Sequence, residues 1–214
     1  SLSVMTDVTE LKASEDRNHR QAISDHLTGL LNRQGFEAVL DSKIAAADAA
    51  DQELACLFVD LDRFKWINDN MGHAAGDAAL IELVERLKTL LAPSDEAARL
   101  GGDEFAILLP AKNAEKRARA MCDQIASIFE TPFGPDMHLS ASVGIAIYPR
   151  HAATAAELLQ KSDMAMYAKK RDGKNGARIF DNSMLDHARR RAEIEAHIEA
   201  GLADDWFEAY LQPI

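Results

Sequence analysis

Four carboxylates, in two short segments of the chain, have the spacing of a metal site. They are Asp60, Asp62, Asp103 and Glu104. The first two end an apolar run from Leu54 to Val59, which is typical of a buried central strand. Two acids at the end of such a strand repel each other and resist desolvation unless a cation lies between them. We therefore predict a hard cation with oxygen ligands, Mg²⁺ before any other, at this end of the strand.

The second pair of acids follows the dipeptide Gly101-Gly102. Two glycines in a row mark a tight turn at which the backbone can come close to a ligand. The apolar run from Phe105 to Leu109 predicts a strand directly after it, so Asp103 is aimed from a rigid hairpin. The alternative is a hairpin whose acids merely face water. For Asp62, capping of the following turn is as good an interpretation as metal binding.

Residues that follow the first pair of acids have the chemistry to recognise a nucleotide. Lys65 supplies a positive charge for phosphate. Asn68 offers a hydrogen-bond donor and an acceptor, and Asp77 offers acceptors only. This combination suits the edge of guanine, whose N1 and N2 donate while its N3 accepts. His73 is interpreted as a turn residue, because no Cys or second His stands at metal-ligand spacing.

These side chains need a sheet to position them, and the apolar pattern predicts one. We expect strands near 53–60, 97–100, 105–110, 138–148 and 177–181. We expect helices near 29–47, 74–92, 112–131 and 154–171. Gly72 and Gly76 should enclose a loop ahead of the second helix. The fold class is an α/β (α+β) sandwich, in which helices flank a mostly antiparallel five-stranded central sheet.

Five motifs of the chain follow the order of one known family. They are Asp25-His26-Leu27-Thr28-Gly29-Leu30-Leu31-Asn32-Arg33, the segment Phe58 to Asp77, Gly101-Gly102-Asp103-Glu104-Phe105, Ser140-Ala141-Ser142-Val143-Gly144-Ile145-Ala146, and Tyr167 to Asn175. With them, the stretch from Asp25 to Phe180 resembles the GGDEF family of diguanylate cyclase domains. By analogy, the expected sheet is like that of nucleotidyl cyclases and of polymerase palms.

The resemblance implies an enzyme that condenses two GTP molecules into cyclic di-GMP and releases two pyrophosphates. It implies a dependence on Mg²⁺, with Mn²⁺ as a substitute, and a homodimer, because each domain binds one GTP. The implied catalytic residues are Asp60, Asp103 and Glu104, and the implied metal ligands are these three and Leu61. The implied substrate-binding residues are Phe64, Lys65, Asn68, Asp77, Gly101, Gly102, Lys170 and Lys174.

Two positions depart from the family's pattern. The family often carries an inhibitory Arg-x-x-Asp site for its product, and the matching positions here begin with Ala92 and end with Asp95. Feedback inhibition is therefore not expected. Lys174 stands where arginine is usual, which keeps the charge and loses the bidentate fork.

The alternative function is a catalytically weak GTP-binding domain that regulates an attached EAL phosphodiesterase.

Both ends of the chain resemble pieces of neighbouring domains. Residues 1–23 resemble the end of a PAS sensor domain and a signalling helix, although an ordinary N-terminal helix is the alternative. Residues 24–181 form the cyclase domain. Residues 182–214 resemble a linker helix and the first strand of an EAL phosphodiesterase domain that is cut off before its hydrolase motif. The expected partners are thus an upstream sensor and a downstream EAL domain in a longer protein.

Composition limits the remaining classes. The 214 residues carry a net charge of −11, which argues against nucleic acid as a partner. No apolar run approaches the roughly 20 residues of a membrane span, and no signal peptide is evident. We therefore expect a cytoplasmic domain without membrane contact of its own, within a full-length protein that could be attached to a membrane. Cys56 and Cys122 are expected to be reduced core residues.

Overall fold

The computed structural model of the chain describes residues 22–203 and Trp206. The chain divides into two compact units, Ser1–Phe180 and Asp181–Ile214. The predicted sensor-like segment 1–23 lies almost wholly outside the described residues, and so does the predicted EAL strand, apart from Trp206. Both assignments stay predictions.

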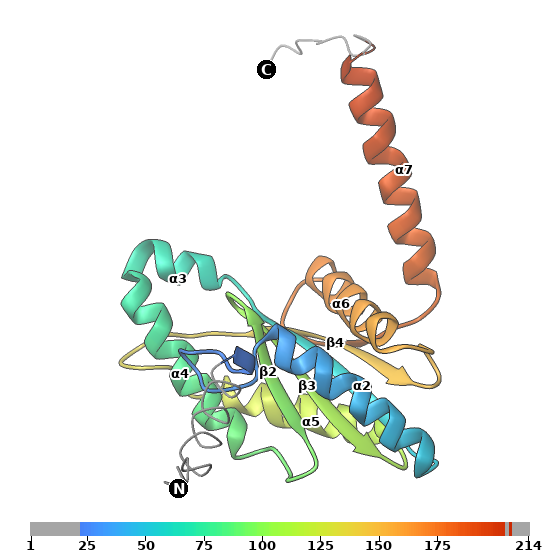
Figure 1. Ribbon diagram of the computed structural model, residues 1–214. Helices are drawn as coiled ribbons and strands as arrows, with labels where there is room; N and C mark the ends of the chain where they lie inside the picture. Colours follow the sequence, from blue (N-terminus) through green and yellow to red (C-terminus); the bar gives the residue numbers. More distant parts are fainter. Residues whose placement is uncertain (1–21, 204–205, 207–214) are drawn as a thin grey trace, which may run out of the picture. The chain divides into compact units, whose positions relative to one another are not determined.

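The first unit is built on one five-stranded sheet with the order β2-β3-β1-β4-β5 (Figure 1). The strands are β1 (Glu53–Leu61), β2 (Glu96–Gly101), β3 (Glu104–Ala111), β4 (Ala141–Tyr148) and β5 (Gly176–Ile179). The pairs β1–β3, β1–β4 and β2–β3 are antiparallel, and β4–β5 is parallel. This arrangement confirms the predicted mostly antiparallel sheet.

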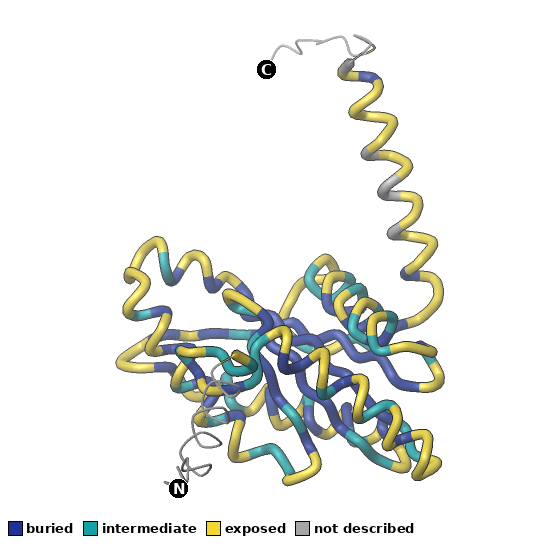
Figure 2. Tube along the Cα trace, viewed as in Figure 1, coloured by how far each residue is buried: buried dark blue, intermediate teal, exposed yellow. Residues whose placement is uncertain are grey.

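Strand β1 is central because its side chains are apolar toward both faces. Ala55, Leu57, Val59 and Leu61 belong to the large core cluster, which the helices α4 (His73–Lys88) and α5 (Ala114–Ile128) complete. Cys56 contacts Ser162 of helix α6 (Ala155–Arg171) on the other face, where Phe58 is also buried. Figure 2 shows the resulting buried layer running through the sheet. The last residue of this second face is Asp60, so the pleat of the strand delivers a carboxylate to the end of an apolar layer.

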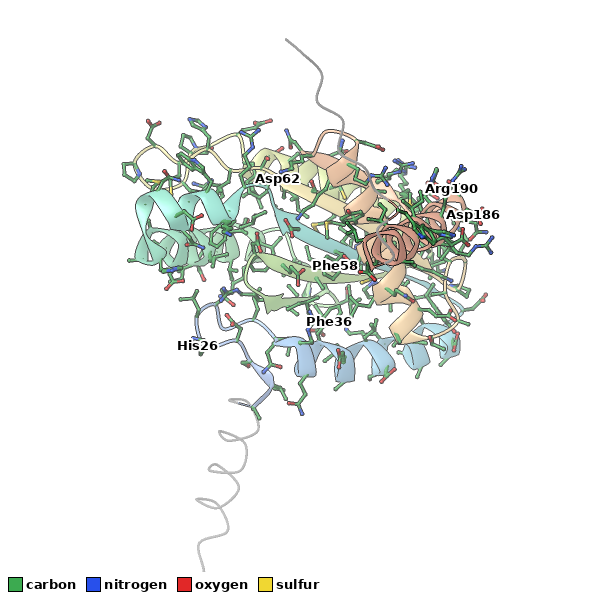
Figure 3. All side chains as sticks on the ribbon, turned by 90° about the horizontal axis from the view of Figure 1, so that it is seen from above. His26, Phe36, Phe58, Asp62, Asp186 and Arg190 are labelled. Carbon is green, nitrogen blue, oxygen red and sulfur yellow. The ribbon has the colours of Figure 1, made fainter. Side chains whose placement is uncertain are left out.

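Five helices of the first unit are described from end to end. They are α2 (Arg33–Ala49), α3 (Phe64–Met71), α4 (His73–Lys88), α5 (Ala114–Ile128) and α6 (Ala155–Arg171). Helices α2 and α6 cover one face, and α4 and α5 cover the other (Figure 1). Phe36 of α2 and Phe58 of β1 are buried where α2 covers the sheet (Figure 3). Asn32, Asn113 and Thr154 cap α2, α5 and α6 with their side-chain oxygens.

A close approach of backbone fixes α6 on the sheet. A Cβ atom at Gly144 of β4 would lie 1.9 Å from the carbonyl oxygen of Ser162 and 2.1 Å from the nitrogen of Met166. No residue other than glycine fits at this distance without a shift of the helix. The contact holds the C-terminal half of α6 against β4, and the next turn of the helix carries Lys170 to the end of β1.

The structure corrects three of the expected element positions. The first helix begins at Arg33 and not at residue 29, because Gly29 adopts a left-handed conformation (φ 70°) in a turn closed by its bond to Asp25. Helix α3 was not predicted. The expected loop between Gly72 and Gly76 is wrong as well, since α4 begins at His73 and Gly76 is buried within it. Strand β4 begins at Ala141, three residues later than expected.

The second unit contributes one described helix, α7 (Ser183–Ala203). Ile194, Ile198 and Leu202 are exposed on it. None of the helices in the described part of the chain is both long and apolar enough to cross a membrane. Both cysteines are free, and burial raises the pKa of the Cys56 thiol to about 12.

Candidate active site

The glycine turn and the end of β1 are neighbours in the sheet. Gly102 has a left-handed backbone (φ 52°), and Asp103 follows it directly before β3. In the register of the antiparallel pair, Asp60 lies opposite Glu104. The amide of Leu61 donates a hydrogen bond of 3.2 Å to the carbonyl oxygen of Asp103. The two predicted acid segments, 43 residues apart in sequence from Asp60 to Asp103, therefore meet at one point.

Asp60 is the most unusual group at this point. Only 5% of the residue is exposed, and its Oδ1 is buried. The ammonium nitrogen of Lys170 lies 2.5 Å from that oxygen as its charge partner. Burial raises the pKa of the Asp60 carboxyl to about 6, and the charges of Asp103 and Glu104 add to the effect while Lys170 opposes it.

Glu104 stands beside these acids in a more open position. Its carboxylate forms a 3.6 Å ion pair with Arg33 at the start of α2. Partial burial raises its pKa, the negative charges of Asp163 and Asp103 act in the same direction, and Arg33 and Lys170 oppose them. Burial also raises the pKa of Asp163 in α6. The site thus gathers more negative than positive charge in a partly desolvated space, which favours a cation.

Arg99 and Asp25 hold the glycine turn in place, a role that sequence reasoning missed. The Nε of Arg99 donates to the carbonyl oxygen of Gly102 at 2.9 Å, and its Nη1 lies 3.2 Å from Asp25 Oδ1. Burial pushes the pKa of Asp25 up, but hydrogen bonds from Thr28 and the charge of Arg99 outweigh this and hold it below its usual range. The signal was present in the sequence, because Asp25 opens the first motif and Arg99 precedes the glycines.

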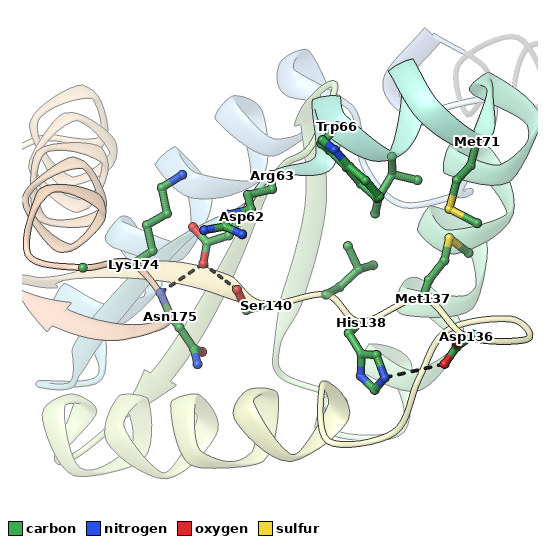
Figure 4. A pocket seen from close by; sticks show the side chains of 13 residues that line it. Asp62, Arg63, Trp66, Met71, Asp136, Met137, His138, Ser140, Lys174 and Asn175 are labelled. Atoms are coloured by element: carbon green, nitrogen blue, oxygen red, sulfur yellow. Dashed lines mark hydrogen bonds and ion pairs between the residues drawn. The ribbon is translucent and has the colours of Figure 1, made fainter.

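Asp62 serves a structural purpose. Its carboxylate accepts hydrogen bonds from the hydroxyl of Ser140 at 2.9 Å and from the backbone amide of Asn175 at 3.0 Å (Figure 4). It also accepts one from the hydroxyl of Ser142 at 2.8 Å. These bonds tie the end of β1 to β4 and to the turn before β5. They occupy both oxygens, so the structure favours a structural role for Asp62 over metal binding. Its partners lie across the sheet, and not in the following turn as the sequence had suggested.

Helices α3 and α4 bring the two predicted guanine-reading residues together. A Cβ atom at Gly76 would lie 2.1 Å from Oδ1 of Asn68 and 3.1 Å from Cζ of Phe64. Glycine at this position therefore lets the Asn68 amide lie against the first turn of α4. Asp77 is the next residue and is exposed. The approach of the two helices depends on the Gly72 hinge between them, whose φ is 83°.

The start of α3 is open to an anion. Arg63 precedes the helix in a left-handed conformation and provides no side-chain cap. The first backbone N–H groups of a helix have no partner within it, and they suit phosphate oxygens. Phe64 and Lys65 are the first two residues, and Lys65 is exposed. Their position agrees with the predicted phosphate contacts, which stay predictions.

Two lysines approach from the end of α6. Lys170 lies in its last turn and faces Asp60, whereas Lys174 belongs to the turn before β5 and has a φ of 61°. Lys174 lines a pocket of about 650 Å³ together with Arg63, Trp66 and other residues (Figure 4). Neither Asn68 nor Asp77 lines this pocket, so we do not assign the nucleotide to it.

The carboxylate oxygens at this point suit a hard cation, although they do not surround one position. No group of three or more His, Cys, Asp or Glu side chains among the described residues converges at metal distance. Asp60 nevertheless has a buried oxygen that already holds a positive charge, the Lys170 ammonium, and Asp103 and Glu104 are near enough to raise the pKa of Asp60. Oxygen donors of this kind are the ligands of Mg²⁺ and Mn²⁺.

Comparisons with known proteins agree on one family. The sequence pattern described as "Diguanylate cyclase, GGDEF domain" matches residues 22–176. Diguanylate cyclase TpbB of Pseudomonas aeruginosa is 44% identical over 165 residues, which cover 75% of this chain and 38% of the relative. Cyclic di-GMP phosphodiesterase NbdA of the same organism is 34% identical over 193 residues, covering 89% of this chain and 24% of the relative.

The fold has the same neighbours. A solved structure that comprises only the GGDEF domain of TpbB superposes with a TM-score of 0.75 at 40% identity, covering 78% of this chain and 99% of that one. The coiled coil and GGDEF domain of DgcB from Caulobacter crescentus, solved in complex with c-di-GMP, gives 0.74 at 27% identity and covers 81% and 93%. The chain spans 26% and 38% of the length of two of its curated relatives.

Proposed function

The chain belongs to the GGDEF domain family of diguanylate cyclases, and from that premise we propose that it condenses two GTP molecules into cyclic di-GMP. One observation carries the proposal. Asp60, a buried carboxylate paired with the Lys170 ammonium, lies at the glycine turn beside Asp103 and Glu104. Its pKa is raised to about 6 in spite of that ammonium, so the cluster of acids favours a divalent cation, and a cation with a triphosphate is what this reaction requires.

The metal ligands in this proposal are Asp60, Asp103, the carbonyl of Leu61 and Glu104. Mg²⁺ is the expected ion, and Mn²⁺ substitutes for it. Bound there, the metal supplies charge for the attacking and leaving oxygens of an in-line displacement. Glu104, whose pKa is raised by burial and by its acidic neighbours, is placed to take the proton of the attacking 3′-hydroxyl.

The nucleotide is held by the elements that surround this carboxylate. Asn68 and Asp77 read the guanine edge between α3 and α4. The open start of α3, with Phe64 and Lys65, holds phosphate oxygens, and Lys170 and Lys174 reach the triphosphate from α6 and the turn after it. The backbone of Gly101 and Gly102 leaves room for the substrate at the turn.

Turnover needs two copies of the domain. Each copy binds one GTP, and each 3′-hydroxyl attacks the α-phosphate of the other GTP, so that two phosphodiester bonds form and two pyrophosphates leave. The two sites must therefore face each other. The proposed neighbours in a longer protein, a sensor before residue 24 and an EAL domain from residue 182, would control how often the copies meet.

A second candidate is a GTP-binding domain that regulates an attached phosphodiesterase without turnover. The observation that favours it is the relative named as a cyclic di-GMP phosphodiesterase. The binding residues are the same in both proposals. The difference lies only in whether the bound GTP reacts.

Incubation of the chain with GTP and Mg²⁺, with chromatography of cyclic di-GMP and pyrophosphate, separates the two candidates. A specific rate that rises with protein concentration supports a cyclase limited by the meeting of two copies. The Asp60→Ala variant should make no product, and the Asn68→Ala variant should mainly lose selectivity for GTP over ATP. Tight binding of GTP without product at high protein concentration supports the regulatory domain.

A further inference from the structure

Lys170 has a partner that the family resemblance does not assign to it. The resemblance places this lysine on the triphosphate, yet its Nζ lies 2.5 Å from Oδ1 of Asp60. The side chain of Asp60 is 8% exposed and that of Lys170 is 30% exposed. The ammonium of Lys170 is therefore the positive charge that compensates this buried carboxylate oxygen. A lysine ammonium is a compact point charge on a flexible stem, and it can take the place of a small cation.

The same oxygen is needed by the metal. Asp60 cannot keep a close ammonium ion and a divalent cation on Oδ1 at once, because the two positive charges would repel each other in a partly desolvated space. We propose that Lys170 is the resident counter-cation of Asp60 in the nucleotide-free protein, and that the divalent metal displaces it toward the triphosphate. This inference rests on the proposed metal site at Asp60.

The fold allows the exchange without a large movement. The backbone of α6 is fixed on β4 at Gly144, so only the side chain of Lys170 has to turn. Its remaining exposure leaves room on the solvent side, where a triphosphate would lie. Lys170 therefore opposes the metal when no nucleotide is present and ceases to oppose it when phosphate oxygens attract the ammonium. By linkage, nucleotide and metal should strengthen each other's binding.

Lys174 provides a matched control. It has the same charge, lies four residues further on, and is assigned to the same triphosphate, but no ion pair joins it to Asp60 among the described contacts. A substitution at Lys174 should thus affect nucleotide binding alone. A substitution at Lys170 should change the binding of metal before any nucleotide is added.

The test is the binding of Mn²⁺ to the full chain without nucleotide, measured by the electron paramagnetic resonance signal of free Mn²⁺ at pH 8. We expect Lys170→Met to bind Mn²⁺ at least about fivefold more tightly than the unsubstituted chain, the lower end of typical couplings between sites. Lys174→Met should bind it unchanged, and Lys170→Arg should stay close to the unsubstituted chain. With a GTP analogue that carries a methylene between its α- and β-phosphates, the advantage of Lys170→Met should disappear.

The controls keep this inference apart from the function on which it rests. Equal Mn²⁺ affinity in Lys170→Met and in the unsubstituted chain, with affinity lost in Asp60→Asn, would overturn the role of Lys170 and leave the metal site in place. Unchanged affinity in Asp60→Asn would overturn the metal site itself. Tighter binding in Lys174→Met to the same extent would show a general charge effect and would also overturn the inference.

Discussion

At the scale of single residues, a carboxylate that is buried at the proposed metal site lowers the stability of the protein that carries it. Burial raises the pKa of Asp60 from 3.8 to about 6. Between these two values the folded chain keeps a proton that the unfolded chain has lost, and above pH 6 the folded chain bears the cost of an ionised buried group. The sign of the effect is that stability falls as the pH rises from about 4 to about 6.

The Asp60→Asn variant should remove this cost. In the presence of EDTA at pH 8, we expect its free energy of unfolding to exceed that of the unsubstituted chain by up to about 3 kcal/mol, since each pKa unit corresponds to about 1.36 kcal/mol. The gain should shrink to near zero at about pH 4, and turnover should be absent at every pH. Urea denaturation at both pH values measures it. The same gain at pH 4 and pH 8 would mean that packing, and not ionisation, is responsible.

At this scale the sequence predicted the chemistry of the candidate site but not the contacts between its side chains. The acids and glycines of the motifs, with their spacing, were sufficient to propose a metal and a nucleotide. The contact between Asp60 and Lys170 was not predictable, because these residues lie 110 positions apart in sequence and meet only when α6 is placed on β4. The structural role of Asp62 was not predictable for the same reason, since its partners come from two distant segments, at Ser140 and Ser142 and at Asn175.

At the scale of elements, two glycines set how closely helices approach their neighbours. Gly76 admits the Asn68 amide between α3 and α4, and Gly144 admits the backbone of α6 on β4. The atoms that an added methyl group would meet differ in kind. At Gly76 they are the ends of side chains, which can turn away, whereas at Gly144 they are backbone atoms of a packed helix, which cannot.

The Gly76→Ala variant should therefore fold normally but bind GTP poorly. The added Cβ forces the Asn68 side chain out of the position proposed to read guanine, so we expect the KM for GTP to rise by about tenfold or more. Steady-state kinetics measures the change, with circular dichroism as the check on folding. The double variant Asn68→Ala with Gly76→Ala should be no worse than Asn68→Ala alone. An additive loss in the double variant would contradict the argument.

The Gly144→Ala variant should lose stability instead. Its Cβ would lie 1.9 Å from the Ser162 carbonyl oxygen, so α6 must move, and we expect a loss of about 2–4 kcal/mol in the free energy of unfolding. Gly29→Ala is the comparison, because it has a positive φ but no atom within 4 Å, and it should cost only about 1 kcal/mol. Denaturant titration of both variants compares them. Equal losses would mean that α6 yields easily.

The elements themselves were largely predictable, and the failures have a common cause. The five strands were found because β1, β3 and β4 are continuous apolar runs between turn residues. Helix α3 was missed because it is short and is bounded by Arg63 and Gly72, whose positive φ angles depend on tertiary contacts rather than on periodicity. The helix expected from residue 29 began late for the same reason, at the left-handed Gly29.

At the scale of the whole molecule, the region that the family uses for product inhibition is occupied by a structural ion pair. The side chain of Asp95 is fully buried, and its carboxylate accepts from the amide of Ala92 at 2.8 Å and contacts Arg117 of α5 at 2.6 Å. Arg117 also donates to the carbonyl oxygen of Pro110. The acid is thus committed to joining β2, β3 and α5, and position 92 supplies no arginine.

We expect added cyclic di-GMP to leave the initial rate of the chain unchanged. The Ala92→Arg variant should stay uninhibited as well, because the Asp95 carboxylate remains paired with Arg117 and is not free to help bind a guanine. Initial rates at increasing cyclic di-GMP, with pyrophosphate as the readout, measure both. Inhibition restored by Ala92→Arg alone would show that the ion pair opens readily.

If the chain is the proposed cyclase, the buried pair of Asp95 and Arg117 has a consequence for the level of the product in a cell. An enzyme that its own product inhibits has a ceiling, above which synthesis slows whatever the stimulus. A cyclase without product inhibition synthesises at the same rate whatever the product concentration, and its output stays proportional to the time that its two copies spend together. The steady concentration of the messenger would then be limited only by the rate of its removal. The hydrolase would fix the upper limit of that concentration, and this chain would fix only how strongly it responds to a stimulus.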